Sequence, residues 1–239
     1  MADTAPARRK APLWLETIIL LVIAIALALV IKTFFVQAFY IPSSSMEPGL
    51  VINDRILVQK PSYWFGEPQR GDVVVFEDPG GWLPGPEPGP TNPVTRAMAA
   101  IGLYPTGGHL VKRVIGVAGD TIVCCDDDGR LEINGQTIDE DEFLAPKRKC
   151  DGPMPSDCRE EWSAGPIPDG DVFVMGDNRA HSADSSQKLC GESERNCDPN
   201  DAFVSVDRIV GKVFALVWPI DNFDWVGRPD TFDDVPDPS

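Results

Sequence analysis

The sequence predicts a mostly β fold, with one N-terminal transmembrane helix followed by an antiparallel β-sheet domain that carries loop insertions. Three observations predict it. A single long apolar stretch lies near the N-terminus, and short runs of β-branched and aromatic residues separated by Gly and Asp turn signals follow it. Helical patterns do not alternate with these runs, as they would in a parallel sheet. A chain of 239 residues has room for one membrane span and one sizeable domain.

The apolar stretch covers residues 17–36 and reads TIILLVIAIALALVIKTFFV, with Lys32 as its one charge. A helix of this length spans about 30 Å, the thickness of the hydrocarbon core of a bilayer. A cleaved signal peptide is the alternative, but its apolar stretch would be only about 7–15 residues long and would precede a small-x-small site. Residues 37–40, QAFY, offer no such site, so we expect an uncleaved anchor.

The distribution of basic residues predicts how this anchor is oriented. Arg8, Arg9 and Lys10 precede the span, whereas after Lys32 the next basic residue is Arg55. The positive-inside rule then places residues 1–16 in the cytoplasm and the domain that follows the span outside the cell membrane. We therefore expect a single-pass protein with a cytoplasmic N-terminus and an extracytoplasmic domain over residues 37–220.

The domain is expected to contain short strands with turns between them. Gly and Pro fill an insertion at about residues 78–108, and a polar insertion covers about 185–202. Residues 221–239 are acidic and Pro-rich, and we expect them to form a disordered tail. The predicted strands are residues 72–76, 110–117, 131–138 (a hairpin around Asn134-Gly135), 172–175 and 209–218.

Composition excludes several function classes. A net charge of −16 would repel phosphate backbones, so nucleic acid is not an expected partner. Two histidines argue against a multi-histidine metal site, and we expect neither a metal nor a cofactor. The six cysteines form no C-x-x-C pair. Disulfides in an oxidising compartment or free thiols both remain possible, and the pairing is left open.

Three segments contain candidate catalytic residues. Three serines at 43–45 lie just outside the predicted membrane, although three serines between prolines also suit a plain linker. Strand alternation places Lys112 on an apolar face with Leu110, and burial would lower its pKa enough for the neutral amine to activate a serine. Arg113 on the other face makes this periodicity ambiguous. In residues 176–185, Ser182 is suited to orienting the lysine, and Asp177 or Asp184 to a salt bridge with Arg179.

Together these segments resemble the type I signal peptidase family, the bacterial leader peptidases. The family pattern P-S-x-S-M-x-P-T-L is matched by residues 42–50, and G-D-[IV]-V-V-F by residues 71–76. K-R-[VA]-[IV]-G-x-P-G-D is matched by residues 112–120, and G-D-N-R-x-x-S-x-D-S by residues 176–185. The four matches occur in the family's order behind an N-terminal anchor. The resemblance covers roughly residues 15–220, less the two insertions.

The resemblance implies a membrane-bound serine endopeptidase that removes signal peptides from exported preproteins and cuts after small residues. It implies Ser45 as the nucleophile, Lys112 as the general base, and the Ser43 hydroxyl with the Ser45 N–H as the oxyanion hole. Ser182 would orient Lys112, supported by Asp177, Arg179 and Asp184. The expected partners are signal peptides and the lipid bilayer, with a monomer acting near the export machinery. The positions that match the family's substrate-binding residues are Phe39, Ile41, Pro42, Met46, Leu50, Leu110 and Val111.

Some positions depart from the family pattern, and other functions compete with this one. Gly49 replaces Thr, Ala118 replaces Pro, and Ser186 stands where Arg is common. A Ser-His-Asp triad would need His109 or His181. A repressor-type Ser-Lys protease would need a DNA-binding domain in place of the anchor. The non-enzymatic alternative is an anchored accessory protein of the cell envelope. A hydrogen bond between the Ser45 hydroxyl and the Lys112 amine would distinguish an enzyme from such a protein.

Overall fold

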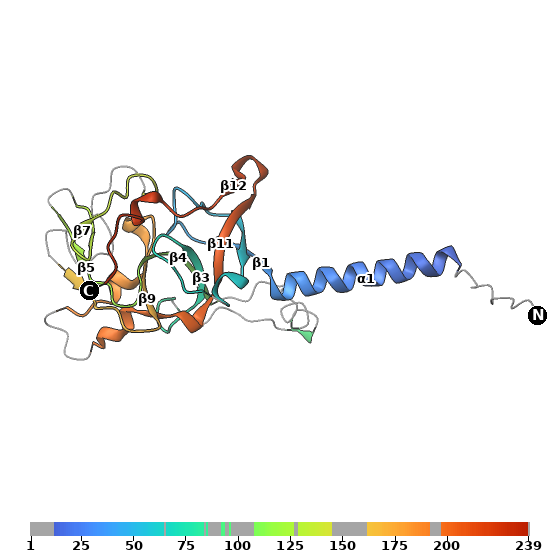
Figure 1. The fold of residues 1–239 in the computed structure, drawn as a ribbon, viewed down its shortest axis with the longest axis horizontal. Helices are drawn as coiled ribbons and strands as arrows, with labels where there is room; N and C mark the ends of the chain where they lie inside the picture. Colours follow the sequence, from blue (N-terminus) through green and yellow to red (C-terminus); the bar gives the residue numbers. More distant parts are fainter. Residues whose placement is uncertain are drawn as a thin grey trace, which may run out of the picture.

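A long N-terminal helix projects from a β domain in the computed structural model (Figure 1). The structure describes residues 12–64, 66–83, 85, 92–93, 96, 108–126, 129–144, 162–191 and 197–238. Helix α1 covers Leu13–Phe34, so it begins and ends slightly earlier than the apolar stretch suggested. Its described side chains are almost all exposed, and over Leu13–Ile31 its mean hydropathy of 2.8 and its length suit a membrane span. A helix that is apolar all round is stable only when lipid or protein covers it.

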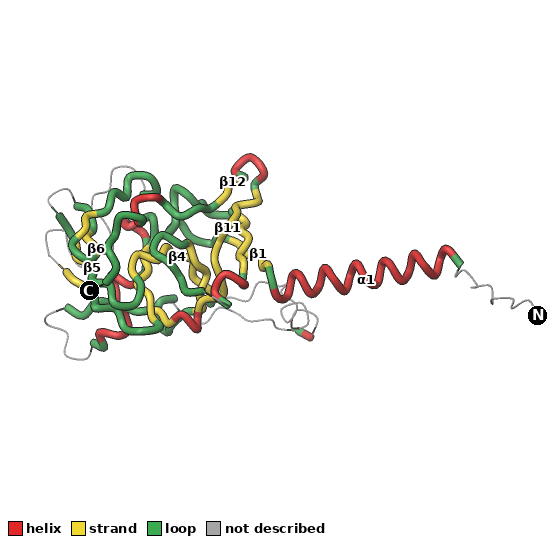
Figure 2. Tube along the Cα trace, in the orientation of Figure 1, coloured by secondary structure: helices red, strands yellow, loops and turns green. Residues whose placement is uncertain are grey.

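The larger sheet has eight strands, and every pairing in it is antiparallel. Figure 2 shows the strands of the domain as yellow segments joined by loops. The strand order of the larger sheet is β1-β2-β11-β3-β4-β9-β10, and the short β12 pairs with β11. This arrangement confirms the predicted fold class. Sequence patterns missed β1 and β2, which flank the serine-rich segment. The strands are β1 (Val36–Tyr40), β2 (Arg55–Gln59), β3 (Val73–Glu77), β4 (His109–Gly116), β9 (Asp171–Met175), β10 (Val204–Ser205), β11 (Ile209–Trp218) and β12 (Asp224–Trp225).

A smaller sheet is inserted between β4 and β9. It comprises β5 (Ile122–Cys124), β6 (Glu132–Ile133), β7 (Gln136–Thr137) and β8 (Trp162–Ala164), in the order β7-β6-β5-β8. The hairpin between β6 and β7 turns at Asn134-Gly135, where φ is +53° and +80°. Both positive angles are those of the type I′ turn that this dipeptide predicted.

Single-turn 3₁₀ helices connect many of the strands. Two of them, η2 and η3, follow β9 and carry part of the 176–185 motif. The seven that the described residues contain are η1 (Pro61–Tyr63), η2 (Arg179–His181), η3 (Ser185–Lys188), η4 (Pro199–Ala202), η5 (Val206–Arg208), η6 (Ile220–Asn222) and η7 (Asp230–Phe232).

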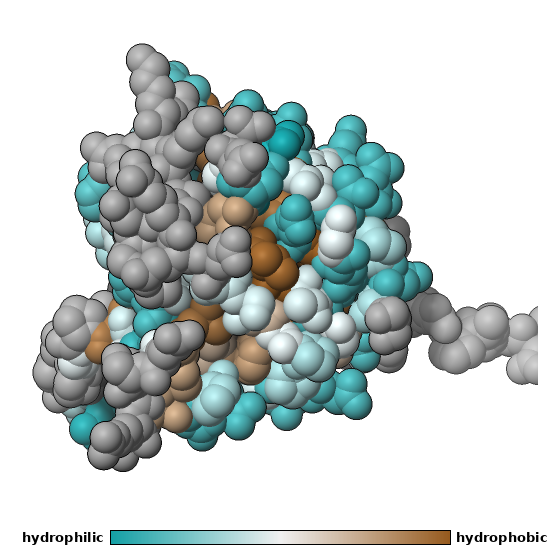
Figure 3. Space-filling view, turned by 90° about the vertical axis from the view of Figure 1, so that its left-hand side faces the viewer, coloured by the Kyte–Doolittle hydropathy of each residue, from teal (hydrophilic) through white to brown (hydrophobic). Residues whose placement is uncertain are grey.

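Three apolar clusters form the core. One lies between the two sheets and includes Ile115, Ile122 and Phe173. The other two include residues of the larger sheet, one around Val73 and Val75 and the other around Val74 and Phe76. Because neighbouring residues of β3 belong to different clusters, both faces of this strand are buried. On the face that points away from α1, the described residues in view are hydrophilic toward the margins and form an apolar strip across the middle (Figure 3).

The expectation of a disordered C-terminal tail is wrong. Residues 224–225 extend the larger sheet as β12, and Phe232 and Val235 are buried in the cluster between the sheets. Arg70 donates hydrogen bonds to the carbonyls of Val235 and Pro236, and the Asn134 side-chain amide also donates to the Pro236 carbonyl, so this segment lies against the turn between β6 and β7. The average composition of this segment is polar, but a few well-spaced apolar side chains suffice to anchor it while its carboxylates stay in water.

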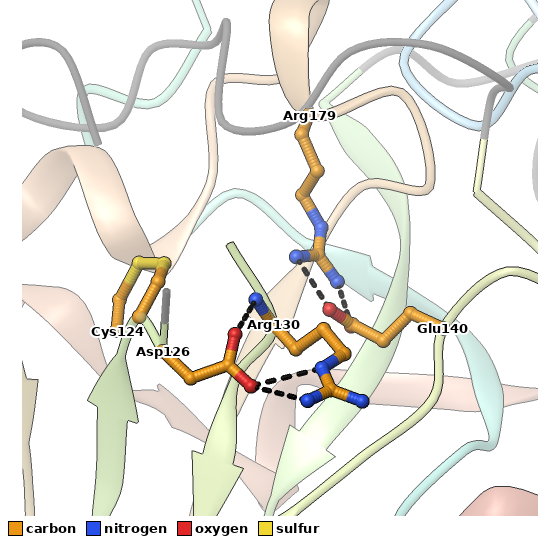
Figure 4. Close-up of a disulfide and its surroundings, with 6 residues drawn as sticks. Cys124, Asp126, Arg130, Glu140 and Arg179 are labelled. Atoms are coloured by element: carbon orange, nitrogen blue, oxygen red, sulfur yellow. Dashed lines mark hydrogen bonds and ion pairs between the residues drawn. A yellow bond between two sulfur atoms is a disulfide. The ribbon is translucent and has the colours of Figure 1, made fainter. Parts of the chain in front are cut away.

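Four of the six cysteines lie in the described residues and form two disulfides. Cys190 bonds to Cys197 and closes the loop between η3 and η4. Cys124 bonds to its neighbour Cys125 at the end of β5 (Figure 4). Cys150 and Cys158, like most of the Gly- and Pro-rich insertion at 78–108, lie outside the described residues.

Candidate active site

Ser45 lies in the loop that connects β1 to β2. Ile41, Met46 and Leu50 are buried in the cluster around Val73, and the Leu50 N–H donates to the Met46 carbonyl. These apolar anchors hold both ends of the serine-rich segment, so it is not the plain linker that its composition allowed. Ser45 itself is only 6% exposed.

Lys112 lies in the middle of β4, and its Nζ is 2.7 Å from the Ser45 Oγ. It also donates to the Val111 carbonyl at 3.1 Å, and the residue is 3% exposed. Burial lowers the pKa of Lys112 from 10.5 to about 8, while the charges of Asp184 and Asp177 act in the opposite direction. The lysine therefore has a substantial neutral fraction at mildly alkaline pH and is in contact with a serine hydroxyl.

Ser43 also contacts the nucleophile candidate, with 3.3 Å between the two hydroxyl oxygens. Because the Ser43 hydroxyl can donate or accept, it is a polar group free to turn toward a charge that develops beside Ser45. Ser45, Lys112 and Ser43 therefore come together as the sequence predicted, although they derive from two segments far apart in the chain.

The segment after β9 fixes the backbone of the serine loop. The Asn178 N–H donates to the Ser45 carbonyl at 3.0 Å, and the Asn178 side-chain amide donates to the Ser44 carbonyl at 3.0 Å. Gly176 lies so close to the Ser45 carbonyl and the Ser182 hydroxyl that a Cβ would overlap both. Asn178 is a site residue that sequence analysis missed, although it stands inside a matched motif.

Asp184 is the centre of a buried hydrogen-bond cluster. Its carboxylate accepts from the Gly176 N–H at 2.9 Å, from the Ser182 hydroxyl, and from the N–H and hydroxyl of Ser186 at 3.1 and 2.7 Å. We expected Ser182 to contact the lysine directly. In the structure its hydroxyl donates to Asp184, whose charge raises the pKa of Lys112. Ser186, a departure from the family pattern, is one of the donors that satisfy this carboxylate.

The ion pairs differ from the expected ones. Asp177 pairs with Arg113, through two hydrogen bonds of 2.8 and 2.7 Å, and not with Arg179. Arg179 instead pairs with Glu140, from the loop after β7 (Figure 4). Arg113, Glu140 and their partners are all buried. Sequence patterns cannot identify Glu140, because it lies 39 residues from its partner and in no matched motif.

The residues expected to bind substrate fall into different environments. Ile41, Met46 and Leu50 share one apolar cluster, against which Phe39 and Val111 pack. Pro42 is exposed. Leu110 belongs to another cluster, with Phe76 and Trp82, because its side chain alternates with that of Val111. Five of the seven residues are therefore brought together, and Leu110 and Pro42 are not part of that group.

The strand that carries Lys112 has an open edge. In the ladders of the described residues, 109–113 of β4 pair with β3, whereas the pairing with β9 begins only at Arg113. Strand β1 also pairs on one side only, with β2, and the Phe39 ring lies 5.3 Å from that of His109. Among the ladders that the structure describes, Leu110–Lys112 are therefore paired on the β3 side alone, which is the arrangement of a sheet edge.

The histidines of the triad alternative are placed elsewhere. The His109 ring packs against Phe39, and His181 Nδ1 lies 3.3 Å from the Asn178 Oδ1. The partner of the Ser45 hydroxyl with the geometry of a general base is Lys112. Within the described part of the chain, no group of three His, Cys, Asp or Glu side chains could hold a metal ion.

Comparison with known proteins finds similarity over most of the chain. The family model described as signal peptidase, peptidase S26, matches residues 14–218. The chain is 39% identical to a signal peptidase I of Mycobacterium tuberculosis over 91% of its length and 76% of the relative's, and 37% identical to a probable signal peptidase I of Mycobacterium leprae over 92% and 81%. A solved signal peptidase I structure from Enterococcus faecalis aligns with a TM-score of 0.31 at 21% identity, over 62% of this chain and 97% of that one.

Proposed function

The chain belongs to the signal peptidase family, peptidase S26, whose members are serine endopeptidases, and we propose that it removes signal peptides from exported preproteins with Ser45 and Lys112 as catalytic pair. The observation that carries the assignment of the pair is the 2.7 Å contact between the Ser45 hydroxyl and a buried lysine amine. A surface serine and a solvated lysine would have no such contact and no lowered pKa.

In the proposed reaction the neutral Lys112 amine takes the Ser45 proton as the oxygen attacks the scissile carbonyl. The negative charge that forms on the carbonyl oxygen is stabilised by the Ser45 N–H and the Ser43 hydroxyl. Lys112 then gives its proton to the leaving amine, and an acyl-enzyme remains. Water attacks this ester with Lys112 again as base, which releases the signal peptide and restores the Ser45 hydroxyl.

The same lysine contacts support roles for the residues around it. Asp184 and Asp177 hold negative charge near the ammonium form of Lys112, which stabilises the protonated intermediate of each step. Ser182 acts on the lysine through Asp184, to which its hydroxyl donates. Arg179 supports the site by fixing the turn at Gly176, whose carbonyl accepts from its Nε at 3.1 Å.

We propose that the substrate binds as an added strand along the open edge of β4. Extended peptide would receive main-chain hydrogen bonds there, and its alternate side chains would point toward the apolar residues beside the serine. Phe39, Ile41, Met46, Leu50 and Val111 form that apolar surface, with Pro42 at its exposed rim. Small side chains before the cut fit such a closely packed surface. Leu110 would contribute through its backbone rather than its side chain.

Helix α1 anchors the enzyme in the membrane, and we propose that the chain before Leu13 is cytoplasmic and the β domain is extracytoplasmic. Strands β11 and β12 lie toward the end of the domain from which α1 leaves (Figure 1), and Trp218 of β11 and Trp225 of β12 are exposed. Such side chains suit the lipid headgroup region. Because residues 224–238 pack onto the domain, the catalytic domain extends from residue 37 to the C-terminal segment. We propose that it acts as a monomer near the export machinery.

The test is cleavage of a purified preprotein by the full chain in detergent. Ser45→Ala and Lys112→Ala should each abolish cleavage, whereas Ser163→Ala, at an exposed serine of β8, should not. Activity that persists in Ser45→Ala would overturn the assignment of the nucleophile. A wild-type chain that cleaves no preprotein would favour the accessory-protein alternative. Retained cleavage in His109→Ala and His181→Ala would exclude the triad.

A further inference from the structure

We propose that the C-terminal segment, residues 228–232, is a positioning element for the active site, with Phe232 as its central residue. This inference rests on the proposed function. It holds that the segment acts through the loop at 138–144 on two buried ion pairs, and that these pairs keep the Asn178 turn against the serine loop. The segment contacts the 138–144 loop, this loop contacts Arg113 and Arg179, and Arg113 pairs with Asp177 beside the serine loop.

The C-terminal segment first holds the 138–144 loop. The Asp139 N–H donates to the Thr231 hydroxyl at 2.9 Å. The Phe232 ring is stacked on that of Phe143, with 6.0 Å between centroids and 23° between planes. Phe232 is 4% exposed, so its contacts are with protein rather than water. A stacked, buried aromatic pair fixes the direction of both rings as well as burying area.

The loop in turn holds two arginines. The Arg113 guanidinium carbon lies 4.3 Å from the centroid of the Phe143 ring, which is the geometry of a cation–π contact. Glu140 from the same loop pairs with Arg179 (Figure 4). Both arginines are buried, and a buried guanidinium that loses a partner is strongly destabilised. The position of this loop therefore affects both arginines together.

Phe232 also borders the third partner of Arg113. The Gly71 carbonyl accepts a hydrogen bond from Arg113 Nη1 at 2.9 Å. A Cβ on Gly71, whose φ is +86°, would lie 2.8 Å from Phe232 and 2.5 Å from Arg228, so the C-terminal segment packs directly on this glycine. Phe232 thus touches both the ring and the backbone turn that hold Arg113.

The Arg113–Asp177 pair connects these contacts to the serine loop. Arg113 binds both carboxylate oxygens of Asp177, and the next residue, Asn178, donates to the Ser45 carbonyl. A cavity of about 300 Å³ adjoins the Arg113–Asp177 pair, and its lining includes Met46, Phe143 and Arg228. The contacts of Arg113 with the Phe143 ring and the Gly71 carbonyl help to hold the pair next to this space.

The test compares Phe232→Ala, Phe232→Leu and Val235→Ala in the full chain in detergent, using preprotein cleavage well below the unfolding temperature. Val235 is the matched control, because it follows that segment and is buried in the same core cluster, while the contacts of Arg113 run through Phe232. A misplaced catalytic group costs up to about 10²-fold in rate, so Phe232→Ala should lower kcat at least about tenfold with little change in KM. Phe232→Leu should retain part of the kcat that Phe232→Ala loses. Val235→Ala should lower the unfolding temperature but not kcat.

A readout beyond rate separates positioning from stability. If Arg113 shifts from Asp177, the carboxylate is less neutralised and raises the pKa of Lys112, so the kcat–pH curve of Phe232→Ala should move to higher pH. Thr231→Val is a milder change, and this variant should fold even if Phe232→Ala does not. It should lower kcat by about two- to threefold, which is less than the loss expected from a misplaced catalytic group. Unchanged kcat and pH curve in a folded Phe232→Ala, or in Thr231→Val, would overturn the inference. An inactive wild type would instead refute the proposed function.

Discussion

Lys112 donates a hydrogen bond of 2.7 Å to the Ser45 hydroxyl, although the two residues are 67 positions apart in the chain. The serine lies on a loop pinned by apolar side chains, and the lysine lies on a strand buried on both faces. Neither position depends on the other, so the contact is a property of the fold. The first two predictions follow from the burial of this amine.

The rate of preprotein cleavage should rise with pH. Lys112 must be neutral to accept a proton, and burial lowers its pKa to about 8, so the active fraction is small at pH 6 and grows as pH passes through about 8. Initial rates at saturating substrate between about pH 6 and pH 10 measure this, with tryptophan fluorescence to show that the domain stays folded. A rate that is flat or falls across this range would contradict a lysine base.

Replacing the lysine should separate activity from stability. Lys112→Met should be inactive but more stable at neutral pH, by about 1–3 kcal/mol, because folding no longer buries an amine that is charged in water. Lys112→Arg should also be inactive, since a guanidinium keeps its proton. Denaturant unfolding of wild type and Lys112→Met measures the difference. As pH rises from about 8 to 10.5, this difference in unfolding free energy should disappear, because the wild-type lysine is then neutral in both the folded and the unfolded state.

Loss of the Ser43 hydroxyl should impair the chemical step and spare substrate binding. Ser43 lies 3.3 Å from the nucleophile oxygen, and removal of one oxyanion-hole donor typically costs about 10²–10³ in kcat. Ser43→Ala should therefore lower kcat by about that factor with KM nearly unchanged, and Ser43→Thr, which keeps a hydroxyl, should retain much more activity. If Ser43→Ala keeps wild-type kcat, the hydroxyl does not stabilise the oxyanion.

Breaking the buried Glu140–Arg179 pair should cost more unfolding free energy than breaking the more exposed Asp126–Arg130 pair. Both side chains are buried, so Glu140→Gln leaves an uncompensated guanidinium and should cost about 3–5 kcal/mol of unfolding free energy. The double variant Glu140→Gln with Arg179→Met should recover much of this loss. Arg130→Gln breaks the more exposed Asp126 pair (Figure 4) and should cost less than about 1 kcal/mol. Additive losses in the double variant would show that the pair is not coupled.

Local patterns predicted those parts of the protein that depend on neighbours in the chain. The predicted apolar stretch forms most of the membrane-length helix Leu13–Phe34 because a run of apolar residues this long favours a helix, and Asn134-Gly135 forms the expected turn because both residues accept positive φ angles. Strands β1 and β2 were missed because their short patterns are ambiguous without the partners that pair with them.

What the sequence by itself determined is the set of chemical groups: the anchor, the serine-rich loop, the strand with Lys112, and the motif at 176–185. Only the tertiary structure decided their partners, pairing Asp177 with Arg113 and Arg179 with Glu140. It also placed Phe232 of an acidic segment in the core. The physical reason is that hydrophobic periodicity and turn chemistry act over a few residues, whereas buried charges select any partner that the fold brings within hydrogen-bond reach.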